Sequence, residues 1–481
     1  MVSQGMCWSL RPPVAAAGEC EEIMTPQQVT DLREFVALLE ERDELRRIAP
    51  EVDPHLEIAA ITDRVCKGAA GRRALLFEQV RGHRLPVLTN LFGSPRRAAW
   101  AVGLEDSDQL RLRLLEELAQ YGDGSAGDRL SRLLSVPAWQ PQLVATAPCR
   151  EVIMNPPDLR LLPALHCWPG DGGRFLTQPL VFSRDPETGR GNCGMYRVQL
   201  FGRDEATLRW RPGSGGARHQ AAWAERNTPM PVAIVLGGDP AAIYASCAPL
   251  PEGADELALA GWLQRRPLAM VPCLSNDLAV PAAAEFVIEG LVEPGSRRME
   301  GPFGNHCGSY DSAAPAALLR VTAITHRQKP LFPATITGPP PMESGYLAKL
   351  SERLLLALLQ VDYPQIIDIN MPMETIFHGV TLLAVRRQRD GDIAELTRAL
   401  WERKPFNRAK LLLFVDEQTD VQDERGCIWR AVNRVDAQRH LLRDGQRLAI
   451  DATGLPGRPL DLDPAVKDLL DRRWVEYGFD G

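Results

Sequence analysis

Residues that could bind a metal ion, a phosphate or a carboxylate are concentrated in about a quarter of this chain. They lie in short stretches at residues 192–197, 209–211, 213–216, 219, 255–261 and 300–306. Amide and carboxylate oxygens bind hard cations, guanidinium groups bind phosphate or carboxylate, and glycines let a backbone approach a phosphate closely. The combination predicts one site for a phosphorylated cofactor, a divalent metal and an acidic substrate.

Three of these residues are candidate metal ligands. Asn192 and Glu256 offer oxygen to a cation such as Mn²⁺ or Mg²⁺, and His219 offers an imidazole nitrogen. Cofactor phosphate and water would complete the shell. Taken alone, a residue of each type is more often a turn residue or a solvated polar group, so composition leaves both interpretations open.

Arg197 is the candidate carboxylate-binding residue. It follows Tyr196 on an expected strand, where the two side chains would project to opposite faces of a sheet. A planar guanidinium binds a carboxylate through two parallel hydrogen bonds, and pairing with Glu300 would orient it. A structural salt bridge between Arg197 and Glu300 is the simpler interpretation of the same pair.

Candidate contacts for a flat, phosphorylated cofactor come next along the chain. Arg209 and Arg211 flank Trp210 and could hold phosphate and stack on a ring, or they could simply alternate on an exposed strand. Ser214 and Gly215 belong to a Gly-Ser-Gly-Gly segment that gives backbone N–H groups access to a phosphate. An isolated segment of this kind is usually only a tight turn.

Asn305 and His306 follow Pro-Phe-Gly in an expected sharp turn beside the site. A histidine there suits proton transfer near neutral pH, although a lone loop histidine is more often a surface residue. The chemistry therefore has to be argued from the whole set of residues.

Composition limits the class of protein that positions these residues. A chain of 481 residues predicts two or three domains, and 45% apolar with 24% charged residues permits a large core. The net charge of −7 and the absence of a basic run exclude a nucleic-acid partner. Ten scattered cysteines without a C-x-x-C pair indicate reduced thiols in a cytoplasmic protein. No apolar run reaches the ~20 residues that a membrane helix needs.

The pattern of apolar residues divides the chain into three parts. Residues 1–23 are expected to be a disordered or non-native extension without a signal peptide, with Met24 as the start. Residues 24–135 predict a helix from Thr25, a second helix after Pro54, paired strands at 74–78 and 85–90, and then charged helices. Residues 136–335 predict strands of a barrel or sandwich with one helix near 255–263, and 336–481 a parallel-leaning α/β domain ending in a strand at 411–415.

Several spaced motifs resemble the UbiD family of decarboxylases, in the order in which that family has them. They are Leu-Arg-Glu-Phe at 32–35, Val-Asp-Pro-His-Leu-Glu-Ile at 52–58, Asn-Leu-Phe-Gly at 90–93, Cys-Trp-Pro at 167–169, Ser-Asn-Asp-Leu at 275–278 and Thr-Gly-Pro-Pro at 337–340. The resemblance covers nearly all of the chain from Met24 to about residue 450. It implies an N-terminal α/β piece, a central split β-barrel that holds a flavin, and a C-terminal α/β oligomerisation domain.

The resemblance also implies cofactors and roles. The cofactor would be prenylated FMN with Mn²⁺, and K⁺ as a further candidate cation. Metal ligands would be Asn192, His219 and Glu256, and catalytic residues Arg197, Glu300, Asn305 and His306. Cofactor contacts would be Met195, Tyr196, Arg197, Arg209, Trp210, Arg211, Ser214 and Gly215. A flavin prenyltransferase would supply the cofactor, and the protein would form a homo-oligomer, a dimer or a hexamer.

One position departs from the family pattern. The family places an acidic proton donor where this chain has Asn305, and a carboxamide cannot act as an acid. Either His306 or water takes over, or the substrate is electron-rich enough to need the acid less, or activity is weak or lost. The leading substrate is a 3-polyprenyl-4-hydroxybenzoate of ubiquinone biosynthesis, which would imply peripheral membrane association. The alternatives are a smaller aryl or heteroaryl acid, and a non-catalytic cofactor-binding paralogue that acts as an assembly partner.

Overall fold

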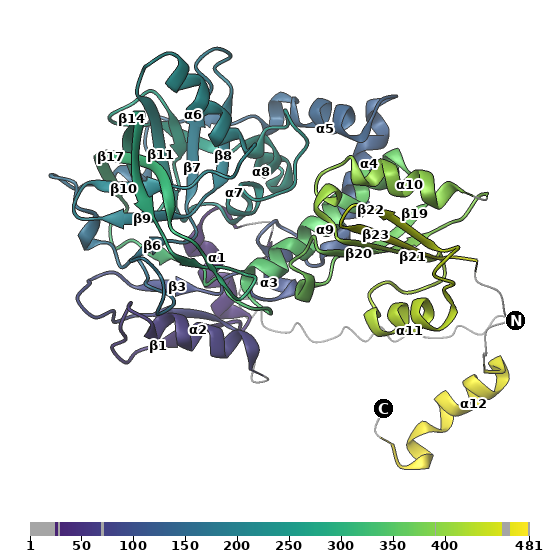
Figure 1. The fold of residues 1–481 in the computed structure, drawn as a ribbon. Coiled ribbons are helices and arrows are strands. Elements are labelled where there is room, and N and C mark those ends of the chain that lie inside the picture. Colours follow the sequence, from purple (N-terminus) through teal and green to yellow (C-terminus); the bar gives the residue numbers. More distant parts are fainter. Residues whose placement is uncertain (1–24, 27–28, 69–71, 390, 455–461, 480–481) are drawn as a thin grey trace, which may run out of the picture.

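The computed structural model describes residues 25–26, 29–68, 72–389, 391–454 and 462–479. The expected extension at 1–23 and the expected start at Met24 lie outside them. Figure 1 shows the N-terminal elements and a large sheet on one side and a smaller C-terminal sheet on the other, with the long helix α9 (Glu343–Asp362) between them. The mixed α/β, multi-domain class predicted from the sequence is confirmed.

A four-stranded sheet in the N-terminal part is completed by a late segment of the chain. Its order is β1 (Leu45–Ile48), β2 (Ala74–Phe77), β3 (Val87–Thr89) and β18 (Phe332–Pro333). The predicted pairing of the strands at 74–78 and 85–90 is confirmed, and it is antiparallel. Because β18 follows the central sheet in the chain, its pairing with β3 fixes the N-terminal part to the central part.

Five α-helices lie in the described residues before residue 135, and the sequence predicted all of them except the third. They are α1 (Leu32–Glu41), α2 (Glu57–Lys67), α3 (Pro95–Trp100), α4 (Ser107–Leu118) and α5 (Ala126–Leu134). The first was expected to end in the charged residues 40–47, but it stops at Glu41, and β1 follows from Leu45. The first helix begins at Leu32 and not at Thr25, because the Asp31 side chain caps it by accepting from two backbone N–H groups. Helices α3, α4 and α5 all pack against α9.

The central part is a nine-stranded antiparallel sheet. Its strands are β5 (Val152–Ile153), β6 (Phe175–Leu176), β7 (Leu180–Arg184), β8 (Gly191–Met195), β9 (Val198–Phe201), β10 (Glu205–Leu208), β11 (Met230–Leu236), β14 (Phe286–Glu300) and β17 (Ala314–His326). The order is β6-β9-β10-β17-β14-β11-β7-β8, and β5 pairs with β17. The short apolar runs of the sequence are therefore strands, as predicted.

The two edges of this sheet are brought together by a short connection. Strand β8 is an edge strand and β9 lies next to the opposite edge, yet only Tyr196 and Arg197 separate them. The Cα atoms of Met195 and Val198 can be at most about 11 Å apart, so the sheet has to curl. No ladder joins β6 to β8 within the described part of the chain, so a closed barrel is not formed there. We call this connection the seam; it places Arg197 between strands, whereas the sequence predicted it on one.

Smaller elements surround the sheet. They are the helices α6 (Gly215–Glu225), α7 (Pro240–Ala245) and α8 (Glu256–Gln264), the three-stranded sheet of β4 (Gln142–Leu143), β12 (Ala269–Pro272) and β13 (Ala279–Pro281), and the hairpin of β15 (Phe303–Gly304) and β16 (Tyr310–Asp311). The predicted helix near 255–263 is confirmed as α8. The sequence analysis missed α6, since its two leading glycines indicate a turn, and it also missed α7.

The C-terminal part is a five-stranded sheet with helices on it. Its order is β19 (Ile366–Asn370), β20 (Val380–Val385), β21 (Leu411–Asp416), β23 (Arg447–Ala452) and β22 (Leu441–Asp444), and its helices are α10 (Asp392–Trp401) and α11 (Glu424–Arg434). The last helix, α12 (Pro464–Arg473), buries none of its side chains and lies away from this sheet in Figure 1. Strands β20, β21 and β23 are parallel, which confirms the parallel-leaning prediction. The sheet continues beyond residues 411–415, where the prediction ended it. None of the helices in the described residues is long and apolar enough to cross a membrane.

Candidate active site

Arg197 is held at the seam by two carboxylates. Its Nε and one terminal nitrogen donate to the two oxygens of Glu300 at 2.7 and 3.1 Å, and its other terminal nitrogen donates to Asp311 at 2.6 Å. The Phe303 ring lies 4.6 Å from the guanidinium carbon. Burial alone would lower the pKa of Arg197, but the bonds to Glu300 and Asp311 outweigh it and raise that pKa. The predicted pairing of Arg197 with Glu300 is therefore present, and Asp311 is an additional partner.

Glu300 is the most enclosed member of this group. Its side chain is 0% exposed, and it also accepts a hydrogen bond from Arg209 at 2.9 Å. Glu300 therefore accepts hydrogen bonds from two guanidinium groups inside the protein. Arg209 thus belongs to the Arg197 group in this structure, and it lies in the loop after β10, not on an exposed strand.

The turn that carries Glu300 is anchored to the neighbouring loop. The Gln199 side chain accepts from the N–H of Gly301 and donates to the carbonyl of Gly172. The Asp171 carboxylate accepts from the N–H of Gly304 at 2.7 Å. A Cβ atom on Gly304 would lie 2.3 Å from the Trp168 ring, so glycine is required there for this close packing. These contacts fix the hairpin β15–β16 against the sheet.

Asn305 lies in the turn of this hairpin and contacts Asp311. The Asn305 amide donates to an oxygen of Asp311 at 2.6 Å, and its carbonyl accepts from the N–H of Cys307. Burial tends to raise the pKa of Asp311, but hydrogen bonds from Arg197 and Asn305 outweigh it and hold this pKa below its usual value. Asp311 was not among the residues singled out in the sequence. The pairing of Phe303 with Asp311 across the hairpin brings it to the site.

His306 faces the C-terminal part of the protein. Its ring lies 6.3 Å from that of Phe377, and with Met342 and Met373 it lines a small cavity. Burial, assisted by the charge of Arg211, lowers the pKa of His306, so its imidazole is neutral at pH 7. His306 is thus half-buried and not a free surface histidine.

The three candidate metal ligands lie on strand β8 or are linked to it and to its neighbour β7 by hydrogen bonds. Asn192 on β8 pairs with Ser183 on β7, and the Ser183 hydroxyl is 2.9 Å from Nδ1 of His219 on helix α6. Glu256 begins helix α8, and its carboxylate accepts from the N–H of Cys193 at 3.4 Å. Glu256 thus contacts the residue that follows Asn192 in the chain, and both Asn192 and Glu256 line the same cavity.

The types of these three side chains would offer a divalent cation two oxygens and one imidazole nitrogen. Burial raises the pKa of Glu256 to about 7, and a cation bound there would favour its ionised form. Burial lowers the pKa of His219, so its imidazole is neutral, as a metal ligand must be. No cluster of three His, Cys, Asp or Glu side chains suited to a metal occurs in the described residues, and the predicted set contains only two of these types.

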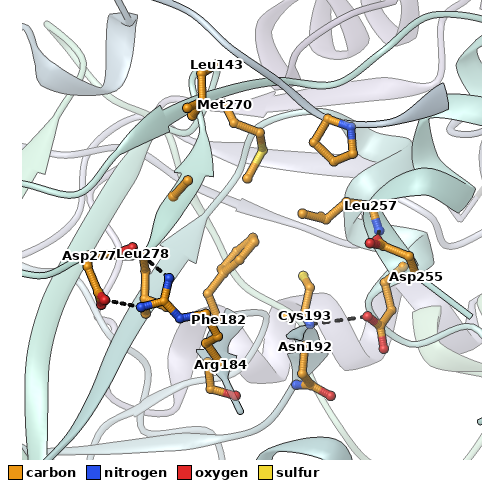
Figure 2. Close-up of a pocket in the computed structure, with 15 residues that line it drawn as sticks. Leu143, Phe182, Arg184, Asn192, Cys193, Asp255, Leu257, Met270, Asp277 and Leu278 are labelled. Carbon is orange, nitrogen blue, oxygen red and sulfur yellow. Dashed lines mark hydrogen bonds and ion pairs between the residues drawn. The ribbon is translucent and has the colours of Figure 1, made fainter. Parts of the chain in front are cut away.

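A cavity of about 350 Å³ opens beside Asn192 and Glu256. Figure 2 shows Phe182, Leu257, Met270 and Leu278 around it, with the ion pair of Arg184 and Asp277 at one side. Glu256, Asp255 and Asp277 give its lining an excess of negative charge. A phosphate at this end would therefore need a cation beside it, which agrees with the chemistry of the ligand set.

Two of the candidate cofactor contacts, Tyr196 and Trp210, pack together at the seam. Tyr196 is buried and packs edge to face on Trp210, with ring centroids 4.8 Å apart. The indole nitrogen of Trp210 is buried without an acceptor in the described residues, so a bound group could supply one. Met195, the last residue of β8, precedes Tyr196, and Arg211 follows Trp210 in an exposed position.

The Gly-Ser-Gly-Gly segment opens helix α6 and is not an isolated turn. The Ser214 hydroxyl caps the helix by accepting from the N–H of Ala217. A Cβ atom on Gly215 would lie 1.9 Å from the Asn192 side-chain oxygen, and one on Gly216 would lie 2.4 Å from the Trp210 ring. The helix N-terminus thus lies directly against a candidate metal ligand, which is a suitable position for a phosphate.

Comparison with known proteins identifies the family. A family model described as 3-octaprenyl-4-hydroxybenzoate carboxy-lyase matches in three parts: its N-terminal domain at residues 36–117, its Rift-related domain at 142–340 and its C-terminal domain at 345–460. A protein of Archaeoglobus fulgidus, described only as uncharacterized, is 38% identical over 416 residues, which cover 86% of this chain and 85% of that one.

Two solved structures extend the comparison. The UbiD-class enzyme HmfF from Pelotomaculum thermopropionicum, in an evolved dimeric form with prFMN, is 28% identical with a TM-score of 0.79, over 92% of this chain and 100% of that chain. Vanillic acid decarboxylase from Sedimentibacter hydroxybenzoicus, in closed form, is 25% identical with a TM-score of 0.82, over 94% and 99%. The three matched domains and these relatives show that the chain belongs to the UbiD family of decarboxylases and is a carboxy-lyase.

Proposed function

We propose that this protein decarboxylates an aromatic carboxylic acid, reversibly and without oxidation, with prenylated FMN and a divalent cation as cofactors. The observation that carries the proposal is the fixed pair of Arg197 and Glu300 at the seam. Glu300 takes one edge of the guanidinium, and the other edge points toward the partly exposed Asp311. A guanidinium held in one orientation by Glu300 can offer its other edge to a substrate carboxylate in competition with Asp311.

The seam also supports the cofactor assignment. Tyr196 and Trp210 present aromatic surface beside Arg197, and the orphaned indole nitrogen of Trp210 can donate to a flavin. The Ser214-capped start of α6 and Arg211 would hold the phosphate. The chemistry that a prenylated flavin supplies when bound is an electron sink for the pair left on the ring carbon when CO₂ departs. A flavin prenyltransferase would supply this cofactor.

Asn192, His219 and Glu256 would hold the cation on the cofactor phosphate. Two oxygen ligands and one imidazole suit Mn²⁺ better than Ca²⁺, which prefers oxygen alone. The half-buried Glu256 has its charge poorly solvated, and a cation would stabilise the ionised form. We assign no residue to K⁺.

A compact aromatic or heteroaryl acid is the substrate class that we favour. The cavity beside His306 is small and is lined by Met342, Met373 and Phe377, so a substrate ring bound there would have little room for a long chain. The action of one solved relative on vanillic acid agrees with a compact acid. A 3-polyprenyl-4-hydroxybenzoate, with a place in ubiquinone biosynthesis and at a membrane surface, is the alternative that the family model's description supports.

The C-terminal part would mediate self-assembly. Its helices α11 and α12 expose apolar side chains, among them Trp429, Val432 and Leu469. Exposed apolar surface of this kind is usually covered by a partner. We therefore propose a homo-oligomer, which the mass of the assembly in solution would test. The domain division at residues 24–135, 136–335 and 336–481 also remains part of the proposal.

The test is a panel of acids offered to protein produced with prenylated FMN and Mn²⁺. The panel contains hydroxybenzoates, vanillate, furan and pyrrole carboxylates, and a short-chain 3-prenyl-4-hydroxybenzoate. Release of CO₂ and formation of the decarboxylated product are measured, and cofactor occupancy is checked by mass. Turnover of a compact member but not of the prenylated one supports the proposal as stated, and the reverse supports the polyprenyl alternative.

Arg197→Ala and Arg203→Ala provide the matched controls. Arg203 is an exposed arginine in the β9–β10 connection, and its nearest polar partner is the carbonyl of Pro157. Loss of turnover only in Arg197→Ala is expected. Full turnover by Arg197→Ala would show that Arg197 does not bind the substrate carboxylate. If the wild type, fully loaded with cofactor, releases CO₂ from no acid of the panel, a non-catalytic, cofactor-binding role is favoured.

A further inference from the structure

The structure contains a carboxyl group next to the position at which the sequence lacks one. Asn305 cannot donate a proton as an acid, but its amide nitrogen lies 2.6 Å from an oxygen of Asp311. We propose that the Asp311 carboxyl group protonates the ring carbon from which CO₂ has left, in the role that Asn305 cannot perform. This inference rests on the proposed function.

The hairpin fixes where the Asp311 side chain lies. Asp311 pairs with Phe303 across the two short strands, and the Phe303 ring lies against the guanidinium of Arg197. One oxygen of Asp311 accepts from Arg197 at 2.6 Å and the other accepts from Asn305 at 2.6 Å. Both oxygens are therefore oriented, one by the substrate-binding residue and one by the carboxamide.

Arg197 also determines where a substrate carboxylate can bind. Glu300 occupies the edge formed by Nε and one terminal nitrogen, so the edge that a second carboxylate can approach carries the other terminal nitrogen. Asp311 is bound at that nitrogen. A substrate carboxylate at Arg197 consequently lies beside Asp311. Asp311 is then within reach of the ring carbon that loses CO₂.

Accessibility separates Asp311 from the other acid of the group. The Glu300 side chain is 0% exposed and lies between Arg197 and Arg209, whereas the Asp311 side chain is 40% exposed. The Glu300 carboxylate is enclosed by its two arginine partners and has no open side toward a substrate. Asp311 has one.

Binding of the substrate supplies the reason for Asp311 to take up a proton. In the free protein, the positive charges of Arg197 and Arg209 and the Asn305 amide favour its ionised form. The neutral His306 and the carboxylate of Glu300 beyond Arg197 are the other titratable groups around it. A substrate carboxylate on Arg197 adds a negative charge beside Asp311 and competes for its partner, and both effects favour protonation.

The step balances without an oxidant or a reductant. The bond between the ring carbon and the carboxylate breaks, CO₂ leaves, and the electron pair remains with the ring. The proton of Asp311 forms the new C–H bond, and Asp311 returns to the carboxylate form. Water restores the proton when the next substrate carboxylate binds. In the reverse direction the same carboxylate removes the ring proton.

The experiment transfers the carboxyl group from position 311 to position 305, the two residues that the hydrogen bond between Asn305 and Asp311 joins. Asp311→Asn removes it, Asn305→Asp adds a second one, and the double variant Asn305→Asp/Asp311→Asn exchanges the two positions. Turnover of the wild-type substrate is measured with the protein loaded with prenylated FMN and Mn²⁺. Exchange of the ring proton of the product for deuterium in D₂O is measured separately, since it reports proton transfer without CO₂.

Asp311→Asn is expected to lower both turnover and exchange by about 100-fold or more, the usual contribution of a general acid. The exchanged double variant is expected to recover most of this loss. Proton uptake supplies a readout that a merely structural role would not change. Calorimetric titration of the FMN-loaded protein with the acid, in two buffers of different ionisation enthalpy, should show proton uptake in the wild type and none in Asp311→Asn.

The outcomes separate this inference from the proposed function. Wild-type rates of exchange in Asp311→Asn, with its melting temperature unchanged, would overturn the inference while decarboxylation itself stands. Loss of exchange in His306→Ala alone would overturn it in favour of His306. If the wild type decarboxylates no acid, the proposed function is wrong and the inference falls with it.

Discussion

Arg197 and Glu300 are 103 residues apart in the chain, and in the structure the arginine Nε lies 2.7 Å from a carboxylate oxygen of the glutamate. The β8–β9 seam supplies the arginine and the far end of β14 supplies the glutamate. The pair therefore exists only when the sheet has curled. Because Glu300 is fully buried and accepts two parallel bonds, the guanidinium has one orientation, and its other terminal nitrogen donates to Asp311.

Arg197→Lys should separate charge from geometry at this position. Lysine keeps the positive charge beside Glu300 but cannot form two parallel bonds, so the fold should persist while turnover falls by about 100-fold or more. Turnover and the melting temperature are measured on the same samples. Arg203→Lys on the same sheet is the control, and its turnover should equal that of the wild type. Near wild-type turnover in Arg197→Lys would show that a point charge suffices.

Glu256→Gln should weaken cation binding without unfolding helix α8. The substitution keeps the size of the side chain but removes the charge that a cation needs. Loss of a residue that only hydrogen-bonds to a metal ligand lowers metal affinity about tenfold or more, so loss of a ligand charge should lower it at least as much. The measurement is FMN binding by fluorescence quenching at increasing Mn²⁺. Glu252→Gln is the control, because Glu252 is exposed near the same helix and pairs only loosely with Arg218. Equal Mn²⁺ dependence in both variants would remove Glu256 from the cation site.

Gly215→Ala should damage the cation site while leaving the helix intact. Alanine is a better helix former than glycine, but its Cβ atom would lie 1.9 Å from the Asn192 oxygen and would displace that side chain. The melting temperature should stay the same or rise, and the Mn²⁺-dependent binding of FMN should fall. Gly191→Ala on the same strand as Asn192 is the control, since a Cβ atom there would have nothing within 4 Å. Unchanged binding in Gly215→Ala would show that Asn192 is not a ligand.

The sequence predicted the elements whose signal is local. Strand β11, which is buried along its whole length, follows from its unbroken apolar run, and Arg197 and Glu300 were paired because their chemistry is complementary. Asp311 was missed because it follows a short Gly-Ser-Tyr run that has no strong strand signal, and only the register of the β15–β16 hairpin brings it to Asn305 and Arg197. The bond from Arg209 to Glu300 was missed for a similar reason, since the loop after β10 and the end of β14 meet only in the folded sheet. Register and curvature are properties of the whole sheet, so a single segment cannot reveal them.

The lowered pKa of Asp311 predicts how the stability of the protein depends on pH. Bonds from Arg197 and Asn305 depress this pKa in the folded state, so the contribution of Asp311 to stability is complete above about 3.9, the usual value for aspartate. It is lost as the pH falls through the lower, folded value, because protonation breaks the pair with Arg197. The difference in melting temperature between the wild type and Asp311→Asn should therefore be the same at pH 7 and pH 5 and should shrink below about pH 4. Asp204→Asn, which alters a carboxylate in the exposed β9–β10 turn, is the control and should leave the shape of this pH dependence unchanged. A difference that grows as the pH falls would mean that Asp311 is neutral in the folded protein. Asp311 would then not form an ion pair with Arg197 in the free protein.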